Sequence, residues 1–114
     1  MNFILWLDDI RQNPYGVEWS KTARSVRTAM NLTRWMINEG CTYILFDLDH
    51  DLGDYAVCGG DGIDFVNWLV ENYHDKDVNF AFHFHSMNPV GVQNMRNAIR
   101  KYWVDRPTPT KLRI

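Results

Sequence analysis

Residues 43–51 read YILFDLDHD. The first six form an apolar run of strand length with a single acid inside it, and such a run is typical of a buried strand. The run passes directly into Asp49, His50 and Asp51, which open a polar, glycine-rich stretch. Loops of this kind often carry binding or catalytic residues. The segment therefore predicts a central strand, Tyr43 to Leu48, with a functional loop at its carboxyl end.

Strands and helices alternate on both sides of this central strand. Each predicted helix follows a residue typical of helix caps, and the last has a proline in its first turn. Alternation of this kind is typical of α/β proteins. The other predicted strands are Asn2 to Leu7, Val17 to Ala23 and Val78 to Phe84, and the predicted helices are Val26 to about Glu39 after Ser25, Ile63 to Tyr73 after Asp61, and Pro89 to about Trp103 after Asn88.

The alternation predicts an α/β fold with a parallel sheet covered on both faces. Right-handed crossovers then give a small, doubly wound, mostly parallel sheet. A chain of 114 residues suits one domain, which we place at residues 1–104. Residues 105–114 contain Pro107 and Pro109, and we expect them to form an extended or mobile tail.

Composition excludes several classes of function. The net charge is −2 and the basic residues are scattered, so the chain lacks the concentrated basic surface that long nucleic acid requires. No apolar run approaches the ~20 residues of a membrane helix, and Met1 to Leu7 lacks the basic flank and cleavage site of a signal peptide. Cys41 and Cys58 have no metal-binding spacing and suit reduced thiols. We therefore expect a cytoplasmic protein whose anionic partner is a small molecule.

Polar residues follow three of the predicted strands. In open α/β sheets, ligands bind beyond the carboxyl ends of the strands, so these residues form the candidate site. The opposite ends of the strands carry no comparable residues. The candidates are Asp8 and Asp9 after the first strand, Asp49, His50 and Asp51 after the central strand, and His85, Ser86 and Asn88 after the last strand.

The acids among these candidates favour a metal site. Carboxylates that are held together repel one another, which raises their pKa values and costs stability. A hard cation such as Mg²⁺ or Mn²⁺ relieves the repulsion. Neutralising Asp8 or Asp9 should then leave the stability of the metal-free protein unchanged or higher. The alternative is that the acids are helix caps and solvated loop charges.

The last predicted strand adds a group for proton transfer. His85 lies at its carboxyl end, and the near-neutral pKa of histidine suits general acid or base catalysis. His83 shares a face of the strand with His85, and we assign it to packing.

The following helix start suits an anion, because its free N–H groups and its dipole favour negative charge. Asn88 and Gly91 lie there, and a plain N-cap and close packing are their respective alternatives. Asn94, one turn further on, and Arg11, after the acid pair, are further candidate ligand contacts beside Ser86. A surface position for Asn94 and a pairing of Arg11 with the acids are the alternatives.

Three motifs in combination resemble the family of cyclic-phosphate processing receiver domains, over about residues 3–103. They are LWLDDIR at 5–11, DHDLG at 49–53 and HSMNPVG at 85–91, with Asn94-Met95 after the last. The resemblance implies a receiver-like or flavodoxin-like three-layer sandwich, in which residues 10–17 are too loop-like to hold a full first helix. It gives Asp8, Asp9 and Asp49 the places of the acid pair and third-strand aspartate of response-regulator receivers, whose lysine is missing here. Such domains occur in bacteria and phages, so a phage-encoded protein in host cytoplasm fits the resemblance.

This resemblance implies the processing of a cyclic phosphate, such as a cyclic nucleotide or a 2′,3′-cyclic phosphate end. We expect metal-dependent hydrolysis, in which one side chain orients the water and another protonates the leaving oxygen. Two alternatives stay open: a module that sequesters a nucleotide without cleaving it, and a signalling receiver phosphorylated on Asp49. The expected metal ligands are Asp8, Asp9 and Asp49; the expected catalytic residues are His85, Asp49, Asp51 and His50; and the expected ligand contacts are Arg11, Ser86, Asn88, Gly91 and Asn94.

Overall fold

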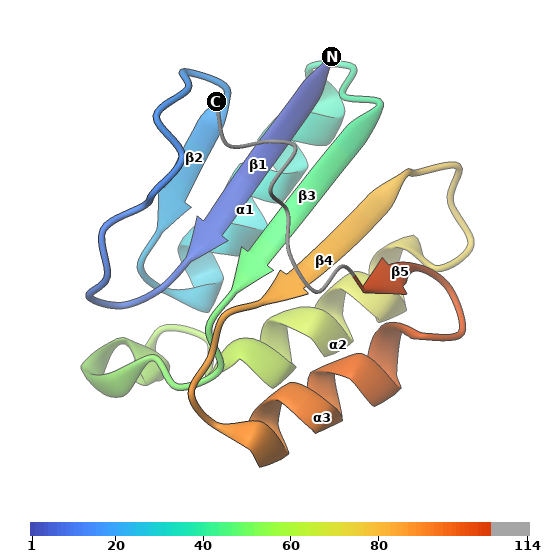
Figure 1. Ribbon diagram of the computed structural model, residues 1–114. Helices are drawn as coiled ribbons and strands as arrows, with labels where there is room; N and C mark the ends of the chain where they lie inside the picture. Colours follow the sequence, from blue (N-terminus) through green and yellow to red (C-terminus); the bar gives the residue numbers. More distant parts are fainter. Residues whose placement is uncertain (106–114) are drawn as a thin grey trace.

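A five-stranded parallel sheet forms the centre of the computed structural model, which describes residues 1–105 (Figure 1). The strands are β1 (Asn2–Leu7), β2 (Ser20–Ala23), β3 (Tyr43–Leu48), β4 (Phe80–Phe84) and β5 (Val104–Asp105); the helices are α1 (Val26–Asn38), α2 (Gly62–Tyr73), α3 (Pro89–Ile99) and the short 3₁₀ helix η1 (Gly53–Val57). The strand order is β2-β1-β3-β4-β5, and every neighbouring pair is parallel. The predicted α/β, receiver-like fold is therefore confirmed.

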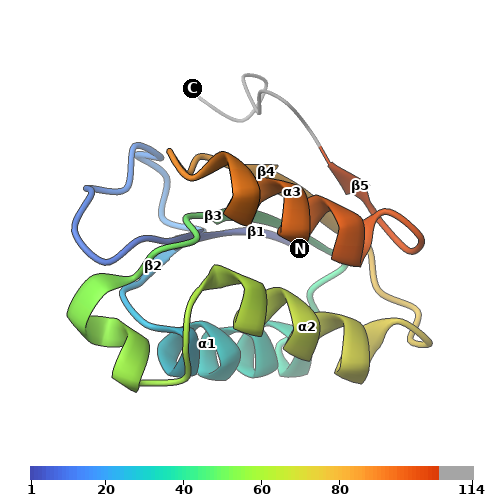
Figure 2. The ribbon, with the colours of Figure 1, turned by 90° about the horizontal axis from the view of Figure 1, so that it is seen from below.

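The three α-helices contribute to the core on one face of the sheet. Each crossover from β2 onward moves in the same direction along the sheet, so right-handed connections bring α1, α2 and α3 to the same face. Figure 2 shows α1 and α2 side by side along the sheet, with α3 beside β4 and β5. The core on this face joins Phe3, Leu5, Leu7, Ile44, Phe46, Leu48, Phe80, Phe82 and Phe84 of the strands to helix residues such as Val26, Met36, Phe65, Leu69, Met95 and Ile99.

The loop between β1 and β2 packs on the other face of the sheet. Tyr15 is buried there in a second core cluster, with Val17 and Trp19 packed against it. No helix interrupts residues 8–19, which agrees with the expectation of a reduced first helix. The sheet thus has a layer of helices on one face and a loop, in place of a helix, on the other. As a result, the hydroxyl of Tyr15 reaches the sheet, where it donates a hydrogen bond to Asp47 of β3.

Local capping explains why the helices begin where the sequence predicts. The Ser25 side chain accepts a hydrogen bond from the N–H of Thr28 at 3.2 Å. Asp61 forms a capping box with Asp64 at the start of α2. Asn88 Oδ1 accepts from the N–H of Gly91 at 2.9 Å, ahead of the first-turn proline of α3. These caps satisfy N–H groups that a helix leaves unpaired at its start.

The last helix ends earlier than predicted. The prediction extended it to about Trp103, whereas α3 stops at Ile99. The N–H groups of Tyr102 and Trp103 both donate to the Ile99 carbonyl and close a turn. This turn places the Trp103 ring 5.2 Å from Phe80 and 5.6 Å from Phe82, measured between centroids, and lets β5 pair with β4. Burying a large aromatic ring and gaining strand pairing outweigh the helix propensity of a few residues.

Two strands begin later than predicted. β2 starts at Ser20 because a turn precedes it, closed by the Ser20 N–H and the Val17 carbonyl at 3.1 Å. β4 starts at Phe80 after a turn that joins Val78 N–H to the Lys76 carbonyl at 2.9 Å. Of the tail predicted over 105–114, Asp105 belongs to β5 and 106–114 lie outside the described residues. Within the described part of the chain, no helix combines the length and the apolar character needed to cross a bilayer.

Candidate functional site

The carboxyl ends of β1, β3 and β4 meet at one edge of the sheet. Ladder hydrogen bonds continue past the strands and fix the first residues beyond them: Asp49 N–H donates to the Leu7 carbonyl at 2.8 Å, and His85 N–H to the Leu48 carbonyl at 3.0 Å. The result is a cluster of Asp8, Asp49 and His85, each with a ligand atom within 4.8 Å of the others. Residues far apart in the sequence are thus brought together as the strand-end argument predicted.

His85 is held between two carboxylates. Its Nδ1 lies 2.6 Å from Asp47 Oδ1 and its Nε2 lies 2.9 Å from Asp8 Oδ2. The ring stacks on the Trp6 indole with a centroid separation of 3.9 Å and an interplanar angle of 3°. Burial alone would lower the pKa of His85, but the hydrogen bonds and negative charges of Asp47 and Asp8 outweigh it and raise this pKa above its ordinary value. The imidazole is therefore fixed in position and biased toward its charged form.

Asp47 and Tyr15 complete this arrangement, and neither is among the catalytic, metal or ligand-binding residues predicted from the sequence. Asp47 is only 2% exposed, and its second carboxylate oxygen accepts a hydrogen bond from the Tyr15 hydroxyl at 2.6 Å. The available signal was an acid inside an apolar strand, because a buried carboxylate requires polar partners. Tyr15 carried no comparable signal, since a tyrosine in a loop has many possible partners.

Asp8 is a structural residue as well as a candidate ligand. Its Oδ1 accepts hydrogen bonds from the N–H groups of Ile10 at 3.0 Å and Arg11 at 2.8 Å, which shapes the turn after β1. Burial would raise the pKa of Asp8, but these two N–H groups and His85 outweigh it, so this pKa is lowered. Arg11 also lies at the site, since its Nη1 donates to the His85 carbonyl at 3.3 Å and its Nε is 4.0 Å from Asp8 Oδ2.

Asp9 experiences the repulsion that was expected of the whole acid cluster. Burial raises the pKa of Asp9, and the negative charges of Asp8 and Asp49 raise it further. Gly53 borders the same carboxylate: its φ is +56°, and a Cβ there would lie 2.7 Å from Asp9 Oδ2. The repelled carboxylate of Asp9, with the carboxylate of Asp49 nearby, is a donor set that suits a hard cation.

Neutralising the two acids of the pair should therefore have opposite effects on the metal-free protein. At pH 7, Asp9→Asn is expected to raise the free energy of unfolding, because an acid with a raised pKa destabilises the fold when ionised. The gain should vanish below about pH 4, where Asp9 is protonated in any case. Asp8→Asn is expected to lower the free energy of unfolding by about 1–3 kcal/mol, because it weakens buried hydrogen bonds. For Asp8 this corrects the expectation from sequence.

Urea denaturation in EDTA at pH 7 and at pH 4 measures both effects. Equal changes for Asp8→Asn and Asp9→Asn would contradict the division between a structural and a repelled carboxylate.

His50, Asp51 and Asn88 form a second polar cluster beside the first. His50 Nδ1 lies 2.8 Å from Asp51 Oδ1, and Asn88 Nδ2 donates to Asp51 Oδ2 at 3.2 Å. The hydrogen bond with His50 is the main cause of a lowered pKa for Asp51. The His50 N–H donates to Asp49 Oδ1 at 2.8 Å, which connects the two clusters. Asn88 therefore both caps α3 and links it to the loop after β3.

Gly91 makes room for His50, which is the close packing named as its alternative. A Cβ at Gly91 would lie 2.5 Å from Cγ of the imidazole, closer than real contacts allow. The ring of His50 thus sits directly against the first turn of α3.

Replacing Gly91 with alanine is expected to destabilise the protein by about 1–3 kcal/mol, the usual cost of overpacking. Alanine favours helices over glycine by about 1 kcal/mol, so helix propensity alone predicts the opposite sign. Gly16→Ala is the matched control, because nothing lies within 4 Å of a Cβ there. Adding His50→Ala to Gly91→Ala should restore part of the loss. A thermal midpoint that rises in Gly91→Ala would show that the ring does not occupy this position.

The remaining predicted ligand contacts divide between the site and the surface. Ser86 follows His85, and its Oγ accepts a hydrogen bond from the Asn88 N–H at 3.1 Å. Asn94 is exposed on α3 and has no hydrogen bond to either cluster within residues 1–105, which fits the surface alternative. His83 is partly buried in β4, where it faces Asp47 in the strand register.

The sequence matches the family model of the cyclic-phosphate processing receiver domain over residues 3–101. The chain belongs to this family. A comparison with curated proteins gave no match. In this cyclic-phosphate processing receiver domain, the two polar clusters lie where the strand ends and the first turn of α3 meet. Carboxylates and imidazoles beside a helix N-terminus are suited to a phosphate-bearing ligand.

Proposed function

We propose that this domain is a metal-dependent hydrolase of a cyclic phosphodiester, such as a cyclic nucleotide or a 2′,3′-cyclic phosphate end. The observation that carries the proposal is the cluster of Asp8, Asp49 and His85 within 4.8 Å, with Asp9 beside it. Carboxylates for a cation and a fixed imidazole for a proton are the groups that phosphodiester hydrolysis requires. Membership of the family supports the choice of a cyclic phosphate.

Asp9 and Asp49 are the foremost candidates to hold Mg²⁺ or Mn²⁺. Asp8 contributes less freely, because backbone N–H groups occupy its Oδ1 and His85 lies on its Oδ2. When bound, the ion would neutralise charge on the phosphate oxygens and acidify a water.

His85 is assigned the protonation of the leaving oxygen. Asp47 engages Nδ1 and Asp8 Oδ2 engages Nε2, so Nε2 reaches the ligand when its contact with Asp8 is exchanged for one with the ester oxygen. Trp6 and the Tyr15–Asp47 hydrogen bond hold the ring in this orientation. As water attacks phosphorus, a new P–O bond forms, the ring ester bond breaks, and the ester oxygen takes a proton from His85 Nε2.

The second cluster is assigned to the water and to the phosphate oxygens. His50 pairs with Asp51 through Nδ1, which leaves Nε2 to orient the attacking water and accept its proton. The positive end of the α3 dipole favours a non-bridging phosphate oxygen, although Asn88 already accepts the N–H groups of Gly91 and Val92. Arg11 lies close enough to His85 and Asp8 to contribute positive charge to the site.

A screen of cyclic mono- and dinucleotides with Mg²⁺, Mn²⁺ or EDTA tests this function, with mass spectrometry reporting both binding and products. Metal-dependent formation of a linear monoester is the expected result. Tight binding with return of intact ligand under every metal condition would replace the hydrolase with a sequestering module. Acetyl-phosphate labelling of Asp49 would favour the phosphoacceptor instead.

Adding millimolar Mg²⁺ or Mn²⁺ is expected to raise the thermal midpoint of the wild type, because an ion bound only by the folded state stabilises it. At a concentration 100 times Kd, the gain is about 2.7 kcal/mol. Asp49→Asn should remove most of the shift, while Asp77→Asn, an exposed acid in the turn before β4, should keep it. Scanning fluorimetry measures all three proteins. Identical shifts in wild type and Asp49→Asn would contradict a metal site at the strand ends.

A further inference from the structure

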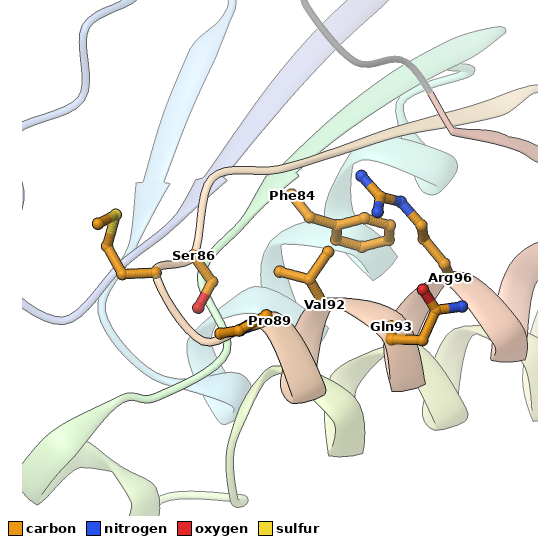
Figure 3. Close-up of a pocket in the computed structure, with 7 residues that line it drawn as sticks. Phe84, Ser86, Pro89, Val92, Gln93 and Arg96 are labelled. Atoms are coloured by element: carbon orange, nitrogen blue, oxygen red, sulfur yellow. The ribbon is translucent and has the colours of Figure 1, made fainter.

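A groove of about 500 Å³ opens beside the candidate site, between the end of β4 and the outer side of α3 (Figure 3). Phe84 and Val92 lie along its floor and are each less than a tenth exposed. Pro89 borders one end with Ser86, and Gln93 and Arg96 border the other, as Figure 3 shows. None of the groups assigned to metal binding or proton transfer lines this groove.

We propose that the groove binds the nucleobase of a cyclic nucleotide whose phosphate lies at the strand-end clusters. The inference rests on the proposed function, because it extends the ligand of the same site. It narrows the ligand of that function to compounds in which a planar, hydrogen-bonding ring is attached to the cyclic phosphate.

The position of the groove connects it to the phosphate site. Ser86 lines the groove and directly follows His85, and its Oγ is bonded to the N–H of Asn88, which contacts Asp51. A ligand whose phosphate lies near His85 and the first turn of α3 therefore passes Ser86 when its remaining part enters the groove.

The length and volume of the groove fit a nucleoside. From Pro89 to Arg96 the helix rises about 10 Å at 1.5 Å per residue, which is about the length of a nucleoside. A volume of about 500 Å³ lies within the usual range for small-molecule sites of 300–1,000 Å³. Inorganic phosphate would leave most of this space unused.

The chemistry of the lining suits a base rather than a sugar or a lipid chain. The exposed ring of Pro89 and the small exposed parts of Phe84 and Val92 provide apolar surface for a ring face. Gln93 offers an amide, and Arg96 a planar guanidinium, for the polar edge of a base. Arg96 is held in place by Asp105, to which its Nε donates, so part of its side-chain entropy is already lost before a ligand binds.

The first test compares three probes: 2′,3′-cyclic AMP, glycerol 1,2-cyclic phosphate and adenosine. Calorimetry is expected to show that 2′,3′-cyclic AMP binds about tenfold more tightly than the base-free glycerol compound, since stacking and edge contacts come from the base. In ¹H–¹⁵N spectra, adenosine alone should shift the amide signals of Val92, Gln93 and Arg96.

The second test uses variants on the exposed side of α3. Gln93→Ala and Arg96→Ala should reduce the preference for 2′,3′-cyclic AMP several-fold while leaving glycerol 1,2-cyclic phosphate binding unchanged. Arg100→Ala is the matched control. Arg100 is an exposed arginine four residues after Arg96, at the end of α3, and it does not line the groove. Gln93→Ala does not touch the Arg96–Asp105 pair, so it keeps the test valid if Arg96→Ala weakens the fold.

The outcomes separate this inference from the proposed function. If cyclic phosphates are hydrolysed but the base adds no affinity and adenosine shifts no groove signal, the groove inference is wrong and the hydrolase stands. If adenosine shifts the groove signals but no cyclic phosphate is cleaved with any metal, the hydrolase is wrong and the base site stands. If no probe binds, both are overturned.

Discussion

His85→Asn is expected to lower the single-turnover rate of cyclic-phosphate hydrolysis by about 10²–10⁴-fold, the usual range for a positioned proton donor. The side chain is held on both nitrogens by carboxylates and stacked on Trp6, so it is fixed before a ligand arrives. Asparagine retains a polar amide near the position of Nδ1 but cannot transfer a proton. Binding of the ligand should change much less than the rate.

Single-turnover hydrolysis and calorimetric binding, measured on the same preparations, separate these two effects. His74→Asn is the matched control, because His74 is exposed at the end of α2, away from the strand ends, where its Nδ1 lies 2.8 Å from the Val70 carbonyl and its ring contacts Tyr102. The control should behave as wild type in both measurements. A normal rate in His85→Asn would remove His85 as the proton donor and make His50, paired with Asp51, the next residue to test.

The sequence was sufficient for the fold because its strongest signals are local. Apolar runs such as Asn2–Leu7 and Tyr43–Leu48 are followed directly by acids, and the helix starts carry caps that the structure uses. β5 could not be predicted in the same way, because a strand of two residues has no periodicity. Its existence depends on Trp103 packing against Phe80 and Phe82, a contact between distant parts of the chain.

The site was predictable to the extent that parallel strands deliver their carboxyl ends to one edge. That rule brings Asp8, Asp49 and His85 together without any knowledge of side-chain contacts. It does not distinguish a carboxylate that is repelled from one that is already bonded. The difference between Asp9 and Asp8 arises from backbone N–H groups and from His85, which only the three-dimensional arrangement reveals.

Asp47→Ala is expected to cost about 3–5 kcal/mol of stability, a large share of the 5–15 kcal/mol typical of a domain. The substitution leaves the Nδ1 side of His85 and the hydroxyl of Tyr15 without the carboxylate that both contact. Breaking a buried charged pair from one side is costly because the remaining group stays buried.

The same pair should give the metal-free protein a characteristic dependence on pH. The pKa of His85 is raised above its ordinary 6.5 by hydrogen bonds and charge from Asp47, then Asp8, which outweigh burial. The stabilisation is therefore fully present below about pH 6.5 and is lost as the pH rises through the higher pKa of the folded state. Asp47→Asn removes the carboxylate charge that raises the pKa of His85 the most, so it should flatten this decline, while the charge of Asp8 preserves part of it.

Urea denaturation in EDTA between pH 6 and pH 9 measures the effect for wild type, Asp47→Asn and Tyr15→Phe. Tyr15→Phe is the informative control: it removes a hydrogen bond to Asp47 but no charge, so it should lower stability by about 1 kcal/mol and keep the pH-dependent decline. A wild-type stability that stays level across this range, or one that rises, would show that His85 is not charged between its two carboxylates. The proton donor of the proposed mechanism would then have to be supplied by another residue.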